Sequence, residues 1–183
     1  MNDLLQLYRD EELLNVTELS WSACRFENIE GLSRLPNLKI LRLVGNQIAA
    51  ISGLDECPLL EIVNLSQNRL ERIEGLESLP HLRELYLGNN RIKRIEGLEG
   101  LKNLEVLMLE GNQIAKIEGL GELPALRRLG LAGNQLWDVS GLLDIGHLRE
   151  VSIESLYNEL DGKAMEIIND WNQEHPTMQL RSR

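Results

Sequence analysis

We predict an α/β fold from this sequence: a right-handed solenoid with a parallel sheet on its concave side, turns or 3₁₀ turns on its convex side and a helical cap at each end. Two observations lead to this prediction. One apolar pattern restarts every 22 residues, and an asparagine and a glycine recur at fixed places inside it. The pattern begins at Val16, Leu38, Leu60, Leu82, Leu104, Leu126 and Leu148.

The unit that begins at Leu82 shows how each repeat is expected to fold. Leu85 and Leu87 alternate with Glu84, Tyr86 and Gly88. This period of two puts the leucines on one face of a short strand and the other three residues on the opposite face. Prolines just before several strands mark the end of the return segment, since proline cannot donate to a strand ladder. These prolines are Pro36, Pro58, Pro80 and Pro124.

The recurring asparagine and glycine each answer a physical need. A buried asparagine amide can bond the backbone groups of its own and the next turn, which otherwise go unpaired. This column is Asn46, Asn68, Asn90, Asn112 and Asn134. Glycine is expected where a tight coil requires a positive φ or a close backbone approach. This second column is Gly31, Gly53, Gly75, Gly97, Gly119 and Gly141.

The chain is expected to form a single domain over residues 1–183, with a helical cap in residues 1–15, seven repeats in residues 16–156 (the last incomplete) and a helical cap and tail in residues 157–183. Asn2 or Asp3 is expected to cap the first helix. Its apolar stripe would be Leu4, Leu7, Tyr8 and Leu14. In the first repeat, Trp21 and Phe26 replace the usual leucine and isoleucine and are expected to pack against this cap.

The C-terminal cap is predicted from a change of period after the last strand. Apolar residues there recur with helical spacing, Pro176 would end the helix, and residues 173–183 are expected to form a frayed tail. The apolar face is Leu160, Ala164, Ile167, Ile168 and Trp171.

Composition limits the classes of function. The formal net charge is −10, and each end of the chain carries seven acids and three bases. The basic residues do not form a contiguous positively charged face in this acidic chain, which argues against nucleic acid as a partner. No apolar run is long enough to span a membrane, and a cytoplasmic location is expected. Cys24 and Cys57 are interpreted as small buried hydrophobic residues. The sequence contains no set of residues typical of catalysis, metal binding or cofactor binding, so no cofactor and no enzyme activity are expected.

The full unit, L-x-x-L-x-L-x-x-N-x-I-x-x-I-x-G-L, resembles the 22-residue class of leucine-rich repeats over about residues 16–156. This class includes the repeats of a regulatory subunit of protein phosphatase 1 and those of bacterial internalins. The resemblance implies a repeat solenoid that binds other proteins.

The candidate binding site is the concave face of the sheet. Several outward strand positions carry apolar residues that the core does not need, and such a surface suggests recognition. Gly88, Gly130 and Ala132 would leave room for an inserted side chain. The candidate residues are Ile40, Arg42, Val44, Ile62, Asn64, Glu84, Tyr86, Val106, Met108, Glu110 and Arg128.

The predicted function is therefore a non-catalytic protein–protein interaction module that binds a protein or peptide partner on its concave face. Two alternatives stay open: a regulatory subunit of an enzyme such as a protein phosphatase, and a self-associating structural protein. A monomer is expected, with a weak homodimer as the alternative.

A second surface lies on the turn edge, the segments that follow the asparagine column. Charge pairing within the molecule, with Glu71 and Glu74, is the favoured interpretation of its basic residues. Trp137, at a matching position, is expected either to be exposed or to lean on the C-terminal cap. The basic residues are Arg69, Arg72, Arg91, Lys93, Arg94 and Lys116.

Overall fold

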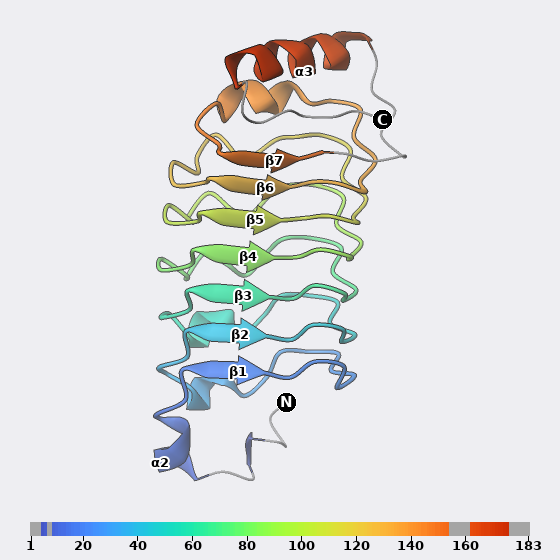
Figure 1. Ribbon diagram of the computed structural model, residues 1–183. Helices are drawn as coiled ribbons and strands as arrows, with labels where there is room; N and C mark the ends of the chain where they lie inside the picture. The colour runs from blue at the N-terminus through green and yellow to red at the C-terminus, as the bar shows by residue number, and fades with distance from the viewer. Residues whose placement is uncertain (1–4, 7–8, 154–161, 176–183) are drawn as a thin grey trace.

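The computed structural model describes residues 5–6, 9–153 and 162–175 of the chain. Its centre is one parallel sheet in which every strand pairs with its neighbour in sequence (Figure 1). The strands are β1 (Glu18–Ser20), β2 (Ile40–Arg42), β3 (Ile62–Asn64), β4 (Glu84–Tyr86), β5 (Val106–Met108), β6 (Arg128–Gly130) and β7 (Glu150–Ser152). The predicted solenoid of parallel strands is confirmed.

The register of the sheet follows the sequence repeat without a slip. Glu84 of β4 lies opposite Ile62 of β3 and Val106 of β5, so residues 22 positions apart are neighbours along the sheet. The middle residue of each strand points into the core, and Leu85 is fully buried there. A slip of one residue would turn every leucine outward, and this cost holds the register.

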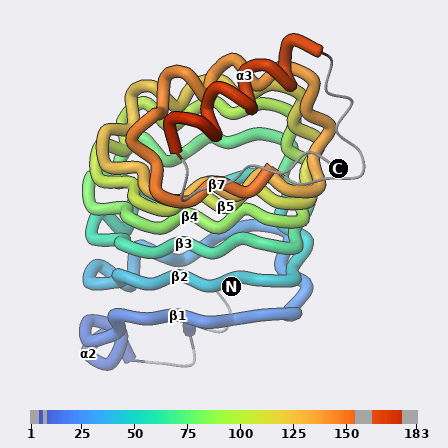
Figure 2. The backbone as a smooth tube through the Cα atoms, turned by 45° about the horizontal axis from the view of Figure 1, so that its top comes forward, coloured from blue at the N-terminus to red at the C-terminus, as the bar shows by residue number. Residues whose placement is uncertain are grey.

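Short return segments lie behind the sheet (Figure 2). Three of them contain 3₁₀ turns: η1 (Leu32–Arg34), η2 (Leu54–Glu56) and η3 (Ser140–Asp144). The expected convex side of turns and 3₁₀ turns is therefore confirmed. Leucines and isoleucines of these segments face those of the strands and form one continuous core along the stack.

The asparagines form the expected buried ladder, with one correction of direction. Asn90 donates from Nδ2 to Leu87 O of its own repeat at 2.9 Å and to Leu65 O of the preceding repeat at 3.0 Å. Its Oδ1 accepts a hydrogen bond from Leu70 N, also of the preceding repeat, at 3.0 Å. The amide thus reaches back one turn and not forward to the next, since the following repeat is served by its own asparagine.

The glycine column meets both expected conditions. Gly97 has φ +69°, in the left-handed region that favours glycine, and a Cβ placed on it would lie 2.5 Å from Ile73 O. Gly141 lies in η3 without a positive φ, yet a Cβ there would also clash with the carbonyl of Ile117. The close approach of successive coils therefore requires glycine even where the backbone conformation does not.

Changing Gly97 to alanine is expected to lower the free energy of unfolding by about 2 kcal/mol, because the new Cβ is strained by the positive φ and must push Ile73 O away. Gly100→Ala is the matched control, since a Cβ at Gly100 would meet Glu77 O at 3.6 Å, an ordinary contact. Urea melts measure both variants. Equal stability of the two would show that the coil spacing does not depend on glycine.

The N-terminal cap differs from the prediction of a helix through residues 1–15. Helix α2 covers only Asp10–Leu13, because Arg9 has an extended backbone, and Leu14 is 49% exposed. Leu5 and Leu13 supply the buried contacts in place of the expected stripe. The other predicted residues of that stripe and its capping residues lie outside the described residues: Asn2, Asp3, Leu4, Leu7 and Tyr8.

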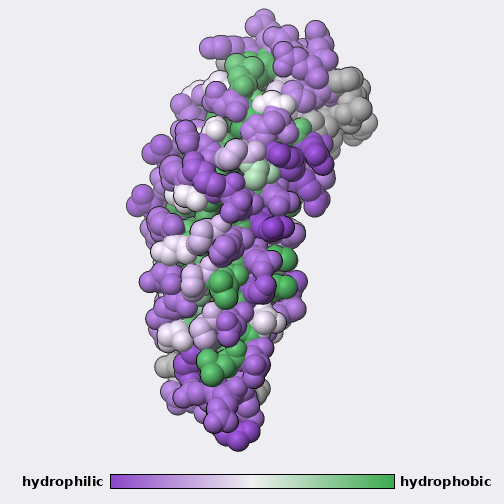
Figure 3. Space-filling model, turned by 90° about the vertical axis from the view of Figure 1, so that its left-hand side faces the viewer, coloured by the Kyte–Doolittle hydropathy of each residue, from purple (hydrophilic) through white to green (hydrophobic). Residues whose placement is uncertain are grey.

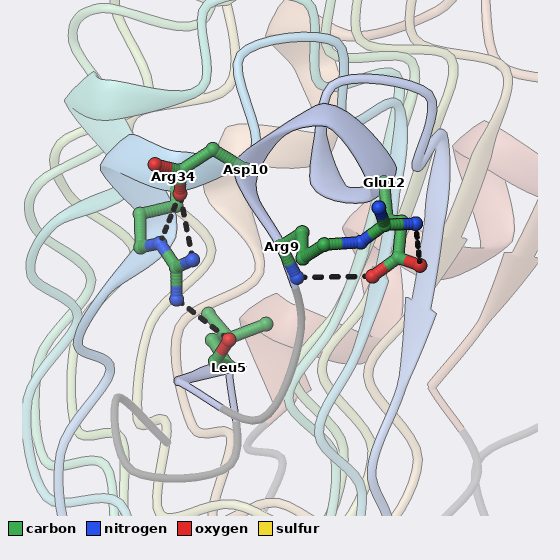
Figure 4. A network of polar contacts seen from close by, with 5 residues as sticks. All are labelled: Leu5, Arg9, Asp10, Glu12 and Arg34. Atoms are coloured by element: carbon green, nitrogen blue, oxygen red, sulfur yellow. Dashed lines mark hydrogen bonds and ion pairs between the residues drawn. The ribbon is translucent and has the colours of Figure 1, made fainter.

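Arg34 of η1 ties this cap to the first repeat (Figure 4). Its guanidinium donates to Leu5 O at 2.6 Å and to the carboxylate of Asp10 at 2.6 and 2.9 Å. Trp21 and Phe26 pack against each other, with ring centroids 5.8 Å apart, and against the core of the stack. Polar anchoring by Arg34 therefore complements a short helix.

The C-terminal cap is helix α3 (Gly162–Glu174), which packs against η3 at the end of the stack (Figure 1). Ala164, Ile168 and Trp171 are buried, as predicted, and Ile167 is partly buried. The expected start of a frayed tail at residue 173 is wrong, because the helix runs through Glu174. Leu160, Pro176 and the remainder of the tail lie outside the described residues.

His175 explains why the chain stays ordered just past the helix. Its ring stacks on Trp171 with centroids 3.9 Å apart, and its Nε2 lies 2.6 Å from Gly146 O. This contact fastens the end of α3 to the segment before β7.

The two cysteines have different environments. Cys57 is fully buried as expected, and burial, with Glu56 and Asp55 nearby, raises the pKa of its thiol to about 11. Cys24 is exposed, contrary to prediction. It occupies the asparagine position of the first repeat, where no earlier repeat lies against it, and only its backbone N–H joins the ladder by donating to Asn46 Oδ1 at 3.0 Å.

Candidate functional site

The candidate site is the outer sheet face, formed by the side chains on the first and third residues of each strand and two residues beyond. The strand register lines these positions up in columns, as the repeat predicts. Nine of the eleven predicted residues are partly exposed there, and Arg128 is exposed. The nine are Ile40, Arg42, Val44, Ile62, Asn64, Glu84, Tyr86, Met108 and Glu110.

Val106 is the exception, and its assignment as a contact residue needs correction. Only 8% of its surface is exposed. Its short side chain lies between the longer side chains of Glu84 and Arg128 on the two paired strands. Val106 therefore lies below the level of these two side chains and offers little surface to a partner.

Charged residues on this face are mostly paired within the molecule. Arg42 forms an ion pair with Glu18, and Arg128 forms one with Glu150 at 2.6 Å. The hydrogen bond to Glu150 raises the pKa of Arg128 further. These pairs span neighbouring strands near the two ends of the sheet, and they fix the long side chains beside the central strands.

Tyr86 lies near the middle of the face and is fixed by its neighbour. Its hydroxyl donates to Glu84 Oε2 at 2.7 Å. Partial burial raises the pKa of Tyr86, and the hydrogen bond and charge of Glu84 raise it further, whereas Arg128 and Arg42 act in the opposite direction. The ring is therefore a neutral, oriented group at neutral pH.

The glycines on this face do not leave the space that the sequence suggested. A Cβ on Gly130 would collide with the carboxylate of Glu110 and would lie 2.8 Å from the sulfur of Met108. The same carboxylate lies 3.7 Å from the corresponding Cβ position of Gly88. Glu110 and Met108 thus fold over the small residues and fill the gap themselves.

Asn64 has a local structural task. Its Oδ1 accepts a hydrogen bond from the backbone N–H of Ser66 at 3.0 Å, which supports the chain where β3 ends. The Nδ2 group of this amide remains available to hydrogen-bond a partner.

The turn edge shows the predicted internal pairing, with different partners. Arg72 pairs with Glu96 at 3.1 Å and Arg94 pairs with Glu118 at 3.0 Å, in each case one repeat further along. Glu71 and Glu74, the expected partners, form no ion pair within the described residues. Lys116 lies 3.7 Å from Asp138, and its Nζ sits 4.5 Å from the centre of the Trp137 ring.

A third row of charges, just before the strands, went unrecognised in the sequence. Lys39 pairs with Glu61 at 2.9 Å, and Arg83 approaches Glu105 at 3.7 Å. The hydrogen bond and charge of Lys39 lower the pKa of Glu61. The alternation of Lys39, Glu61, Arg83 and Glu105 at intervals of 22 residues is the signal that would have revealed this row.

The described residues contain no group of three histidine, cysteine, aspartate or glutamate residues placed to hold a metal ion. None of the described helices is long and apolar enough to cross a membrane. The side of the molecule where the strands begin is largely hydrophilic, with separate hydrophobic areas along its length (Figure 3).

Two family models match the chain. One, described as "Leucine rich repeat", matches residues 80–136, and the other, described as "Leucine Rich repeats (2 copies)", matches residues 58–100. No curated protein matches the chain significantly.

Two similar solved structures are internalins of Listeria monocytogenes strain 4b F2365. The internalin inlF is 24% identical with a TM-score of 0.78, over 99% of this chain and 52% of that one. Internalin C2 is 22% identical with a TM-score of 0.69, over 96% of this chain and 84% of that one. The chain thus spans about half the length of inlF, and at these identities the likeness is one of fold.

Proposed function

We propose that this chain is a non-catalytic module that binds a protein or peptide partner on its outer sheet face. The matches to two leucine-rich repeat models and the similarity of its fold to two internalins support an interaction module in general. The observation that carries the proposal is the band of partly exposed apolar side chains on that face. Ile40, Ile62, Tyr86 and Met108 lie on four consecutive strands, and Val44 lies beside them.

The outer sheet face has a size that suits a single protein segment. Seven strands about 4.8 Å apart span roughly 29 Å. A helix of about five turns has this length. The internal ion pairs at Arg42 and Arg128 hold polar groups in fixed positions around the apolar band, so little side-chain entropy would be lost on binding.

Tyr86 is the proposed centre of the surface. An oriented aromatic ring presents apolar area at low entropic cost, and its hydroxyl can select a polar partner group. Met108 on the adjacent strand adapts to irregular shapes. Glu84, Asn64, Glu110, Arg42 and Arg128 would form the polar surroundings and set the register of the partner.

Tyr86→Ala is expected to weaken partner binding by about 2 kcal/mol or more, because binding energy concentrates in a few central aromatic residues. The partner would first be captured from the source cells with the wild-type chain, and its Kd would then be measured by calorimetry. Arg69→Ala, an exposed change on the turn edge, is the control and should leave the Kd within about twofold. A Tyr86→Ala variant that is folded and binds normally would contradict the outer-face assignment.

The two alternative functions, regulation of an enzyme and self-association, predict different results when the same purified protein and source cells are used. An enzyme-regulating subunit would capture an enzyme and change its rate on addition. A self-associating structural protein would show a mass that rises with concentration in sedimentation equilibrium, and Tyr86→Ala would reduce that rise. The proposed module stays monomeric and captures a partner without altering a catalytic rate.

A cytoplasmic location is part of the same proposal. It is supported by Cys24 and Cys57, which are free thiols. Thiols persist unpaired in reducing compartments. Fractionation of source cells should recover the protein with cytoplasmic markers, and recovery outside the cytoplasm would contradict this part of the proposal.

A further inference from the structure

Trp137 is half exposed on the turn edge, away from the outer sheet face. Its exposed fraction is 50%, whereas Trp171 is 2% exposed. A large aromatic ring left in water is the kind of residue that anchors protein contacts. The ring borders open space toward the preceding repeats, and a second hollow separates it from Lys163 and Ile167 of α3.

The first of these spaces is a shallow hollow of about 400 Å³. It exists because Ala115 is small. The residues at the matching position of the repeats before and after it, Lys93 and Trp137, are much larger. Two repeat spacings, about 10 Å, separate those neighbours, and Ala115 between them leaves that gap unfilled. The hollow is lined by Lys93, Arg94, Ala115, Lys116, Glu118 and Trp137.

One cation that lines the hollow, Lys93, forms no ion pair among the described residues, although Glu71 and Glu96 line the next hollow with it. Arg94 is neutralised by Glu118 at 3.0 Å, and its pKa is raised by that hydrogen bond. Lys116 lies near Asp138, whose pKa is lowered mainly by hydrogen bonds from Ser140 and also by Lys116. Lys93 forms no ion pair or hydrogen bond within the described part of the chain. A protein of net charge −10 thus presents an ammonium group without an ion pair on the opposite side of this hollow from an exposed indole.

We propose that this hollow binds a partner segment in which an aspartate or glutamate lies next to an aliphatic side chain. The carboxylate would pair with Lys93, and the aliphatic group would rest on Ala115 and the Trp137 ring. This site is separate from the outer sheet face and does not rest on the function proposed there.

The probe is the acetylated, amidated peptide Gly-Glu-Leu-Glu-Gly, titrated into the full chain and followed by NMR. The chain has three tryptophans, so three indole N–H signals are expected, and Trp137→Phe identifies the one from Trp137. The peptide is expected to shift that signal in a saturable way. The same peptide with glutamine in place of glutamate should bind at least about tenfold more weakly, since charge pairing with Lys93 is lost.

Lys93→Glu is expected to weaken peptide binding by at least about tenfold. Arg91→Glu is the matched control: it is exposed, makes the same change of charge and does not line the hollow. Ala115→Leu tests the apolar half of the site, because it fills the floor, and the bulky Lys93 and Trp137 at equivalent positions show that the repeat accepts large residues there. This variant should fold and should abolish the shift.

Four outcomes would overturn the proposal: equal weakening by Lys93→Glu and Arg91→Glu, equal binding of the glutamine peptide, an unchanged shift in Ala115→Leu, or a Trp137 signal that moves with protein concentration alone. The last result would mean that a second copy of the chain occupies the site. Tyr86→Ala should leave the titration unchanged, so failure here and failure of the outer-face proposal are distinguishable.

Discussion

Asn90→Leu is expected to lower the free energy of unfolding by about 1–3 kcal/mol. The substitution leaves Leu70 N without its acceptor inside the stack. It also removes one of the two amide hydrogen bonds to each of Leu65 O and Leu87 O, which keep those from Asn68 and Asn112. A buried N–H that loses its partner costs about 1–3 kcal/mol, and the two carbonyls that keep another donor lose less. The added apolar surface of leucine recovers part of the total. Urea denaturation followed by circular dichroism measures the change.

Arg91→Leu is the control for this experiment. It places the same side chain next door in the sequence, on an exposed position, and should change stability by no more than about 0.5 kcal/mol. If the Asn90→Leu melt overlays the Arg91→Leu melt, the ladder contributes nothing to stability. Because each asparagine also binds the preceding repeat, the loss should also reduce the cooperativity between repeats.

The interior repeats could be predicted from the sequence because the same pattern of apolar residues, asparagine and glycine recurs in each of them. Leu85, Asn90 and Gly97 each satisfy a local demand (burial on a two-residue period, backbone bonding in a turn, and close packing of coils), and each demand recurs with the 22-residue step. The pairing of strands then follows from the step alone. Only the direction of the asparagine bonds needed the three-dimensional arrangement of neighbouring turns.

The structure at the ends of the stack was less predictable because those residues lie outside the 22-residue pattern. Leu14 and Leu13 are equally apolar in the sequence, yet only Leu13 is buried, since the backbone of Arg9 is extended and the helix begins after it. The tertiary bonds of Arg34 to the cap set this arrangement. Cys24 was misassigned for a related reason: its position is buried only where another repeat precedes it.

The candidate site shows a similar division. The strand register predicts which residues share the outer sheet face, but it does not predict how far their side chains reach. Glu110 and Met108 cover Gly130, and Val106 lies low between longer neighbours. These outcomes depend on rotamers and on contacts between strands. The hollow beside Trp137 likewise arises from the contrast between Ala115 and its larger column neighbours, a difference that the shared pattern does not record.

Trp171→Ala is expected to lower the free energy of unfolding by about 4 kcal/mol, the largest effect of a single substitution considered for this chain. The Trp171 ring is 2% exposed, lies in the core with Ala164 and Ile168, and stacks on His175 at 3.9 Å. Its removal leaves a cavity under α3 and releases the contact that holds His175 against Gly146. The end of the apolar core would then be covered less well.

Trp171→Phe separates the cavity from any role of the indole nitrogen. Trp171 Nε1 is buried and has no hydrogen-bond partner among the described residues. Phenylalanine keeps most of the ring and removes that unpaired donor, so its cost should be no more than about 1 kcal/mol. Thermal and urea melts of both variants decide the matter. If Trp171→Ala is as stable as Trp171→Phe, α3 does not serve as the cap of the solenoid, because a cap that holds the last repeat closed cannot lose its central side chain without cost.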